Sequence, residues 1–340
     1  MSPKERALAA LKRRYHDRPP VISPTSVATT ESMDLTGAAF PEAHRDAWKM
    51  AALAAAGRDL LGFDNVMPYF SITAEAEALG AKISEGAKDV MPSVIMRPFS
   101  EPGEFVMPDD FLERPPVKTI LDAIRILKKE FGDGAAVCGK VIGPWTLAYN
   151  LYGAENFLAD LIEEPEKAKE FLRAFMIIPL TFAAAQFEAG ADMLTWADHA
   201  TGDMVSAAMY GEFLFPAHVE CVRRLREKIG GAPVILHTCG KALDRMPMFA
   251  KTGFDCFHFD SKNDPSEALA AVGGRVLLAG CVSNNAVLLN GTPDDVKKQT
   301  NAIIDAGVQL IAPECAVPCG VKNENLRAIS ETAAERYNKR

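Results

Sequence analysis

Three residues of types that bind soft metal ions follow two apolar runs of this sequence. His237 and Cys239 end the run that begins at Pro233, and Cys315 follows the run Val308–Ala312. Side chains two positions apart on a strand point to the same side, so His237 and Cys239 leave their strand together. If both runs are strands of one parallel sheet, Cys315 reaches the same edge. One imidazole and two thiolates suit Zn²⁺, with a fourth position open for chemistry.

Two carboxylates also follow apolar runs, and we expect both to take part in catalysis. Asp260 follows the run Cys256–Phe259 and could fill the fourth zinc position until a substrate displaces it. Asp198 ends another run. Either aspartate could instead solvate a loop or cap a helix. Cys319 ranks below Cys315 as a metal ligand, because Cys315 stands directly at its strand end.

A zinc site with two cysteine ligands favours chemistry on sulfur. A thiol is mostly protonated at neutral pH, and binding to Zn²⁺ deprotonates it while leaving it reactive. Alcohol dehydrogenases use a similar ligand set. However, no Gly-x-Gly-x-x-Gly follows a strand here, which argues against a nicotinamide oxidoreductase. These residues therefore predict alkyl transfer to a thiol.

Short apolar runs alternate with helical patterns along the whole chain, which predicts an α/β fold. This alternation implies parallel strands joined by helical crossovers. Eight runs favour a closed (β/α)₈ TIM barrel over a doubly wound open sheet, and barrel active sites lie at the carboxyl ends of the strands. We expect the strands at Pro20–Ser23, Asn65–Tyr69, Ala135–Val141, Met193–Ala197, Val234–Thr238, Cys256–Phe259, Val276–Cys281 and Leu310–Pro313.

We expect residues 1–340 to form a single barrel domain with two additions. Residues 1–19 have the pattern of an amphipathic helical arm that ends at two prolines. Residues 70–118, which follow the second strand, are too many for one strand–helix connection and are rich in Pro, Gly and Met. They predict an insertion over the barrel mouth, such as a lid or a hairpin.

Composition and charge limit the classes of partner. Of the 340 residues, 48 % are apolar and 24 % are charged, which is ordinary for a soluble globular protein. The net charge of −8 argues against nucleic-acid binding. The start of the sequence lacks the apolar segment of a signal peptide, and the apolar stretch Phe175–Ala185 is short for a membrane span. We expect a cytoplasmic protein with no membrane partner and seven free or metal-binding cysteines. A homodimer is compatible with this composition.

The whole chain resembles the uroporphyrinogen decarboxylase superfamily, and within it the zinc methyltransferases that move a methyl group from methylcobamide to coenzyme M. The segments Pro3–Lys12 and Asp17–Val21 are similar to that superfamily's start. The likeness to the methyltransferases is carried by Met33–Gly37, Phe40–His44, Gly143–Pro144, Glu188–Asp192 and Asn323–Leu326. Its most specific motifs are Leu236-His-Thr-Cys-Gly240 and Ile311-Ala-Pro-Glu-Cys315.

This resemblance implies a (β/α)₈ barrel and a zinc ion bound by His237, Cys239 and Cys315. It also implies that an acid after the sixth strand completes the zinc shell. That acid maps onto Asp260, although the family more often has Glu there. Asp198 matches an acid at the active-site mouth. Decarboxylation of porphyrinogens is not expected, because the Arg-Gln-Ala-Gly-Arg-Tyr segment that holds their carboxylates is replaced by Thr25–Glu31, which has no arginine.

The predicted function is that of a zinc-dependent corrinoid methyltransferase. It would move a methyl group from a methyl-Co(III) corrinoid such as methylcobalamin, on a corrinoid carrier protein, to a small thiol such as coenzyme M. One alternative runs the other way, from a small methyl donor such as a methoxy-aromatic compound or a methylamine to cob(I)alamin. A second alternative is a corrinoid- or zinc-binding scaffold without turnover. Glu314 and Cys319 depart from the methyltransferase pattern beside the zinc residues, so the sequence does not define the acceptor thiol.

Overall fold

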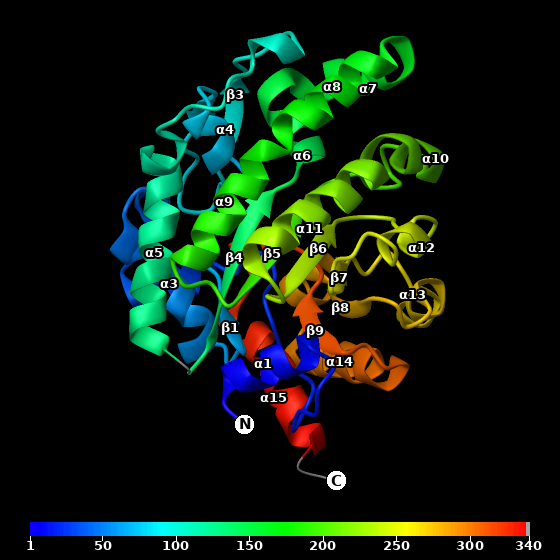
Figure 1. The fold of residues 1–340 in the computed structure, drawn as a ribbon. Coiled ribbons are helices and arrows are strands. Elements are labelled where there is room, and N and C mark those ends of the chain that lie inside the picture. The colour runs from blue at the N-terminus through cyan, green and yellow to red at the C-terminus, as the bar shows by residue number, and fades with distance from the viewer. Residues whose placement is uncertain (133, 338–340) are drawn as a thin grey trace.

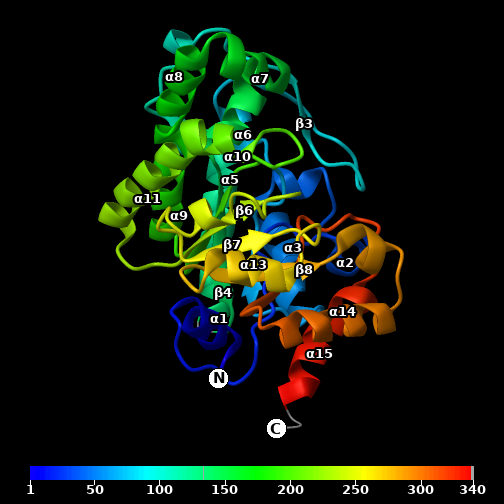
Figure 2. The same ribbon diagram turned by 90° about the vertical axis from the view of Figure 1, so that its right-hand side faces the viewer.

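The computed structural model describes residues 1–132 and 134–337, and at its centre seven parallel strands form one curled sheet (Figures 1 and 2). The strands follow one another across the sheet in the order in which they follow along the chain. They are β1 (Asn65–Val66), β4 (Ala136–Ile142), β5 (Met193–Ala197), β6 (Val234–Thr238), β7 (Cys256–Phe259), β8 (Leu277–Val282) and β9 (Leu310–Pro313). All seven are buried along their length, because helices cover the outside and side chains fill the inside.

An eighth segment joins the two edges of the sheet, but it is much shorter than the predicted strand Pro20–Ser23. Only Val21 forms a bridge, parallel to Ile311 of β9. On the other side, the Val21 carbonyl accepts a hydrogen bond from Asp64 N, directly before β1 (2.7 Å). Prolines stand on both sides of this segment, and proline has no N–H to donate to a neighbouring strand. The predicted TIM-barrel fold is confirmed, with a first strand reduced to one bridge.

Helices surround the sheet (Figure 1). In α5 (Pro115–Phe131), the buried residues Ile120, Ile124 and Leu127 recur at helical spacing and face the core. The other helices are α2 (Thr30–Thr36), α3 (Ala47–Asp59), α4 (Ala74–Ala78), α6 (Pro144–Ala148), α7 (Ala154–Glu163), α8 (Pro165–Phe175), α9 (Ile177–Glu188), α10 (Ala207–Met209), α11 (Phe215–Ile229), α12 (Met246–Phe249), α13 (Pro265–Val272), α14 (Pro293–Ala306) and α15 (Asn323–Tyr337).

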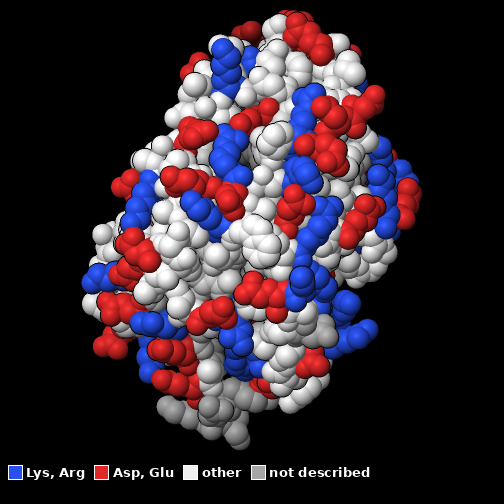
Figure 3. Space-filling view, turned by 90° about the vertical axis from the view of Figure 1, so that its left-hand side faces the viewer, with Lys and Arg blue, Asp and Glu red and all other residues white. Residues whose placement is uncertain are grey.

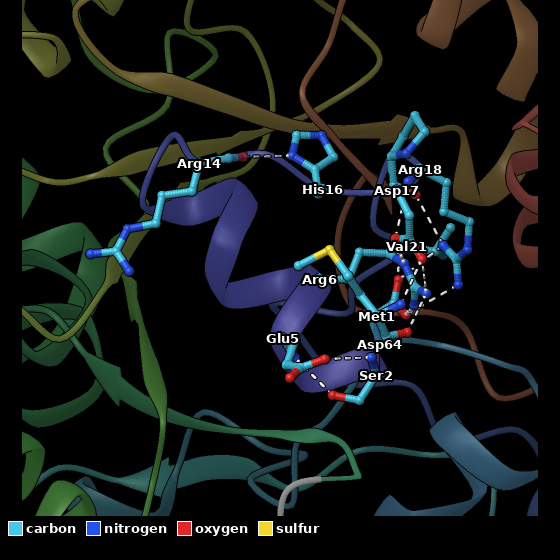
Figure 4. A network of polar contacts seen from close by, with 11 residues as sticks. Met1, Ser2, Glu5, Arg6, Arg14, His16, Asp17, Arg18, Val21 and Asp64 are labelled. Atoms are coloured by element: carbon cyan, nitrogen blue, oxygen red, sulfur yellow. Dashed lines mark hydrogen bonds and ion pairs between the residues drawn. The ribbon is translucent and has the colours of Figure 1, made fainter.

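The N-terminal arm contains helix α1 (Pro3–Leu11), which lies at the end of the molecule where both chain termini are found (Figures 1 and 2). Figure 4 shows the polar network that fixes it. Arg6 forms ion pairs with Asp17 (2.6 Å) and with the fully buried Asp64 (2.7 Å), and Arg18 binds Asp64 from another side (3.0 Å). The network thereby fixes the segment that leads to the bridge formed by Val21.

Residues 70–118 contain α4 and an antiparallel hairpin formed by β2 (Lys82–Ser84) and β3 (Ser93–Met96). The hairpin lies away from the chain termini, on the side of the molecule to which β4 runs (Figures 1 and 2). A role of this segment as a lid stays a prediction.

Two features of the structure bear on membranes and nucleic acids. The helical run Pro165–Glu188 is long and apolar enough to cross a membrane, but 61 % of its most apolar window is buried inside the protein. It is longer than the apolar stretch noted in the sequence, because α8 and α9 follow each other with one residue between them. Its burial is typical of a core helix.

On the face shown in Figure 3, basic and acidic side chains are interspersed, without one continuous basic area that would suit a phosphate backbone.

Candidate metal centre

His237, Cys239 and Cys315 converge at the carboxyl ends of β6 and β9. Cys239 Sγ lies 3.0 Å from His237 Nε2 and 2.8 Å from Cys315 Sγ. Cys315 Sγ lies 3.4 Å from the same imidazole nitrogen. His237 is almost fully buried, whereas both cysteines are partly exposed. The structure therefore brings together the three residues that the sequence predicts as zinc ligands, in a cluster whose two cysteines are partly exposed.

The backbone at the end of β6 directs two of these side chains. His237 is in register with His258 of β7, and the centres of their rings lie 4.6 Å apart. Directly after Cys239, Gly240 has a φ of +75°, a conformation that side-chain-bearing residues rarely adopt. A Cβ at Gly240 would also overlap Thr201 Oγ1. Only glycine fits at this turn, which brings Cys239 Sγ back toward His237.

Cys315 is positioned by the buried residue that precedes it. Glu314 Oε1 accepts a hydrogen bond from Asn284 N, which follows β8 (2.7 Å). Its Oε2 accepts one from Ser261 N, which follows β7 (3.1 Å). One carboxylate thus joins the ends of three neighbouring strands, and this fixes the backbone from which Cys315 Sγ reaches the cluster.

Burial and hydrogen bonding set the protonation of the cluster. The pKa of His237 lies well below its usual value, because burial and the neighbouring rings of His258 and His199 disfavour the imidazolium ion. The imidazole is therefore neutral and has a lone pair for a metal ion. The hydrogen bond between the two thiols, together with burial, raises the pKa of Cys239. The same hydrogen bond lowers the pKa of Cys315, so Cys315 ionises first.

This donor set fits zinc. One neutral nitrogen and two sulfurs, all within 3.4 Å of one another at a barrel mouth, match a catalytic zinc site with three protein ligands. Sulfur ligands favour zinc over hard ions such as Mg²⁺, which require oxygen.

The structure adds His199, a donor that the sequence interpretation did not single out. The ligand atoms of His199, His237 and Cys239 all lie within 4.8 Å of one another. His199 Nε2 is 3.8 Å from Cys239 Sγ, and burial lowers the pKa of His199. The available sequence signal was its place directly after Asp198, at the end of a predicted strand.

Asp260 lies beside the cluster, but its carboxylate has backbone partners. Oδ2 accepts a hydrogen bond from Gly240 N (2.9 Å), and Oδ1 accepts one from Lys262 N (2.9 Å). The first of these bonds fixes the turn after Cys239. Ligation of a metal by Asp260, as the sequence predicts, would require these bonds to rearrange. His199 Nε2 faces Cys239 without such a competing bond among the described residues.

Asp198 is fully buried below the barrel mouth. Oδ1 accepts hydrogen bonds from the N–H and the hydroxyl of Thr146 in α6 (2.8 and 3.0 Å), and Oδ2 lies 3.1 Å from His218 Nε2. A Cβ at Gly143 would overlap this carboxylate, so glycine is needed for its approach to α6. Thr146 Oγ1 in turn accepts a hydrogen bond from His199 N (2.8 Å). These contacts connect Asp198 through Thr146 to the backbone of His199, and a catalytic role of Asp198 stays a prediction.

Cys319 does not reach the cluster in the described part of the structure. It is 8 % exposed, and its Sγ makes no hydrogen bond with the three ligand candidates. Its backbone carbonyl accepts a hydrogen bond from Thr30 N (2.8 Å), which ties this loop to the region near α2. The remaining cysteines are free and buried: Cys138, Cys221, Cys256 and Cys281.

One family model matches nearly the whole chain. The model of the uroporphyrinogen decarboxylase (URO-D) family covers residues 2–336. The chain belongs to the uroporphyrinogen decarboxylase family. The resemblance inferred from the motifs around the cluster is thereby confirmed.

Relatives within this family narrow the class of activity. This chain is 33 % identical to a methylated-thiol–coenzyme M methyltransferase of Methanosarcina mazei, over 99 % of this chain and 91 % of that protein. It is 32 % identical to the methylcobamide:CoM methyltransferase MtbA of Methanosarcina acetivorans, over 98 % of this chain and 97 % of that protein. A uroporphyrinogen decarboxylase of Chlorobium phaeobacteroides is 26 % identical over 72 % of this chain and 70 % of its own. The chain is an enzyme of the methyltransferase class, as predicted.

Solved structures agree with the fold. A methyltransferase from Methanosarcina mazei superposes with a TM-score of 0.95 at 29 % identity, covering 99 % of both chains. A B12-independent methionine synthase from Shewanella sp. W3-18-1 superposes with a TM-score of 0.63 at 15 % identity, covering 95 % of this chain and 98 % of that one. The second likeness shows a shared fold alone.

Proposed function

We propose that this enzyme is a zinc-dependent corrinoid methyltransferase that transfers a methyl group from a methyl-Co(III) corrinoid to a small thiol such as coenzyme M. The observation that carries the proposal is the convergence of His237 Nε2, Cys239 Sγ and Cys315 Sγ within 3.4 Å at the barrel mouth. The names of two relatives support it, since both include coenzyme M and one of them includes methylcobamide.

His237, Cys239 and Cys315 would hold the zinc ion, and Zn²⁺ bound there would make an incoming thiol ionise at neutral pH. The surrounding residues keep the ligands in place. His258 Nε2 donates a hydrogen bond to the Pro313 carbonyl (2.7 Å), which fixes its ring beside His237. Two ligand thiolates offset the charge of a dication, so a sulfur nucleophile at this site stays electron-rich.

The atoms and electrons of the proposed methyl transfer balance with the thiol and the methyl-corrinoid as the only reactants. The thiol sulfur forms the new S–CH₃ bond as the Co–C bond breaks. The corrinoid leaves with the electron pair as cob(I)alamin, and the thiol proton is released to solvent. Neither an oxidant nor a reductant is consumed.

The partner that delivers the corrinoid would be a carrier protein in the cytoplasm. The barrel mouth and residues 70–118, which include the hairpin β2–β3, form the surface we propose for its docking. Demethylation of another donor in the reverse direction is not favoured, because the relatives include enzymes named for methylcobamide and coenzyme M. A scaffold without turnover is not favoured either, since the relatives are named as enzymes.

Product analysis after metal exchange tests this proposal. The enzyme is stripped with a chelator, reloaded with one equivalent of zinc, and mixed with methylcobalamin carrying a deuterated methyl group and 2-mercaptoethanesulfonate. We expect mass spectrometry to find the deuterated methyl thioether only with the reloaded enzyme. Equal product formation by the stripped enzyme would contradict a role for zinc. Absence of product from the reloaded enzyme, with this thiol and with related thiols, would contradict methyl transfer to thiols.

A further inference from the structure

The three predicted ligands leave a fourth position at a tetrahedral zinc ion, and a protein side chain can fill it until a substrate binds. Further described side chains with donor atoms lie near the cluster, and the candidates are His199, His258, Asp260 and Glu314. Their hydrogen bonds show which donor atoms are available. An atom that already takes part in a short hydrogen bond must give it up before it can bind a metal ion.

Both carboxylates hold the backbone at the strand ends. Asp260 accepts hydrogen bonds from Gly240 N and Lys262 N, each 2.9 Å long. The Glu314 carboxylate accepts hydrogen bonds from backbone N–H groups that follow β7 and β8. Metal binding by either carboxylate would therefore loosen the backbone that carries the two sulfur ligands.

His258 is tied to β9 and is fully buried. Its Nε2 donates a hydrogen bond to the Pro313 carbonyl (2.7 Å), and its ring centre lies 4.6 Å from that of His237 on the neighbouring strand. Only Nδ1 lacks a partner, and that atom is buried as well. A ligand that a substrate replaces has to lie where the substrate can arrive from solvent, and His258 does not.

His199 combines an available donor atom with partial exposure. Its Nε2 lies 3.8 Å from Cys239 Sγ, and the ligand atoms of His199, His237 and Cys239 all lie within 4.8 Å of one another. With Zn–N bonds of about 2.0 Å and Zn–S bonds of about 2.3 Å, a nitrogen and a sulfur on one tetrahedral ion lie about 3.5 Å apart. The separation of His199 from Cys239 is therefore close to that of two ligands of the same ion.

The backbone of His199 is fixed beside the cluster. Its N–H donates a hydrogen bond to Thr146 Oγ1 (2.8 Å). The rings of His199 and His237 meet edge to face, with their centres 6.0 Å apart and their planes at 83°. Two imidazoles that are not stacked can each direct a nitrogen at one ion. Small side-chain movements are thus sufficient to bring His199 into the metal shell.

We propose that His199 is the fourth zinc ligand of the enzyme without substrate, and that the acceptor thiol replaces it. This inference rests on the proposed function and deepens it by naming the ligand that exchanges. In the exchange, the Zn–N bond to His199 breaks, a Zn–S bond to the substrate forms, and the thiol proton is released to solvent. Asp260 holds the turn after Cys239 in both states instead of binding the metal.

X-ray absorption at the zinc edge counts sulfur and imidazole ligands without requiring turnover. For the wild type we expect two sulfurs and two imidazoles without thiol, and three sulfurs and one imidazole with 2-mercaptoethanesulfonate. His199→Ala should have one imidazole in both states. Asp260→Asn is the matched variant, because the amide oxygen can still accept a backbone hydrogen bond, and it should keep two imidazoles and the exchange.

Calorimetric titration of zinc-loaded enzyme with 2-mercaptoethanesulfonate, without a methyl donor, gives a second readout. A thiol that must displace His199 binds more weakly than one that replaces water, so His199→Ala should bind this thiol about 10-fold more tightly. By the same linkage, the weaker zinc affinity of His199→Ala should disappear when the thiol is saturating. A residue that merely supported the cluster through a hydrogen bond to Cys239 would leave thiol binding unchanged or weaker when removed.

Three results would overturn the inference. One is a single imidazole in the wild type without thiol, and another is two imidazoles in His199→Ala, which would assign the position to His258. The third is unchanged or weaker thiol binding in His199→Ala. If the wild type has two imidazoles but methylates no thiol, the proposed function fails while the assignment of His199 stands.

Discussion

Removal of the Asp198 carboxylate should destabilise the protein strongly, because four buried donors depend on it. Thr146 N, Thr146 Oγ1 and His218 Nε2 lie 2.8, 3.0 and 3.1 Å from its oxygens, Trp145 N lies 3.5 Å from one of them, and Asp198 and His218 are both fully buried. Each buried donor that loses its acceptor costs about 1–3 kcal/mol. Because the donors are coupled, we expect Asp198→Ala to lower the free energy of unfolding by about 3–5 kcal/mol in total.

Asp198→Asn separates this effect from a simple loss of volume. The amide keeps an oxygen for both bonds from Thr146 and changes only the group that faces His218 and Trp145 N. We expect a loss of about 1–2 kcal/mol, since the hydrogen bond to His218 is the only short one affected. Asp203→Asn is a control, because its ion pair with Lys262 is partly exposed and worth about 0–1 kcal/mol.

Urea unfolding of metal-free protein measures these differences, since bound metal would add its own stabilisation. The positioning role also predicts that Asp198→Ala weakens zinc binding more than Asp198→Asn does, because Thr146 connects this carboxylate to His199 N. An Asp198→Ala variant that stays within about 1 kcal/mol of the wild type would refute the reasoning, because the loss of a buried carboxylate with four donors should cost more than this. A larger loss in Asp198→Asn than in Asp198→Ala would refute it as well.

Three further predictions follow from individual contacts. His199→Ala should weaken zinc binding about 10-fold in a chelator competition, whereas unchanged affinity would show that His199 does not support the site. Asp64→Ala leaves Arg6 buried without one of its partners and should cost about 3–5 kcal/mol in urea unfolding. The exposed Asp59→Ala serves as its control, and equal stability of the two variants would contradict this ion-pair assignment. Burial lowers the pKa of His44 to about 4, so protonation favours the unfolded state below its ordinary value of 6.5. The free energy of unfolding should therefore fall by up to about 3 kcal/mol between pH 6.5 and pH 4, and His44→Phe should remove this part of the slope. An identical slope in His44→Phe would contradict the assignment.

The sequence was sufficient to predict the barrel and the cluster of His237, Cys239 and Cys315. The physical reason is that strand periodicity places positions 237 and 239 on one side, while parallel strands bring their carboxyl ends to one edge. Prediction of this cluster requires the order of the strands, but not the individual contacts between residues far apart along the chain. The first strand was predicted too long, because its apolar residues were given more weight than the prolines that remove hydrogen-bond donors.

The surroundings of the cluster could not be predicted in the same way. Asp198 and His199 are adjacent in sequence, and only the structure shows that Asp198 is buried against α6 while His199 faces Cys239. The partners of Asp198 come from Thr146 and His218, which lie far from it along the chain. Lys140 was part of a predicted apolar strand, and only the structure shows that its Nζ lies over the ring of Tyr69.

The rate of cob(I)alamin formation tests the central claim most directly. Zinc-loaded enzyme is mixed with methylcob(III)alamin and 2-mercaptoethanesulfonate without oxygen, and the visible spectrum is followed. We expect rapid formation by the wild type and by Cys281→Ser, whose thiol is buried and outside the cluster. We expect none by Cys239→Ser or Cys315→Ser, together with loss of bound zinc. Wild-type rates in Cys315→Ser would contradict the claim that these residues hold the metal that activates the thiol.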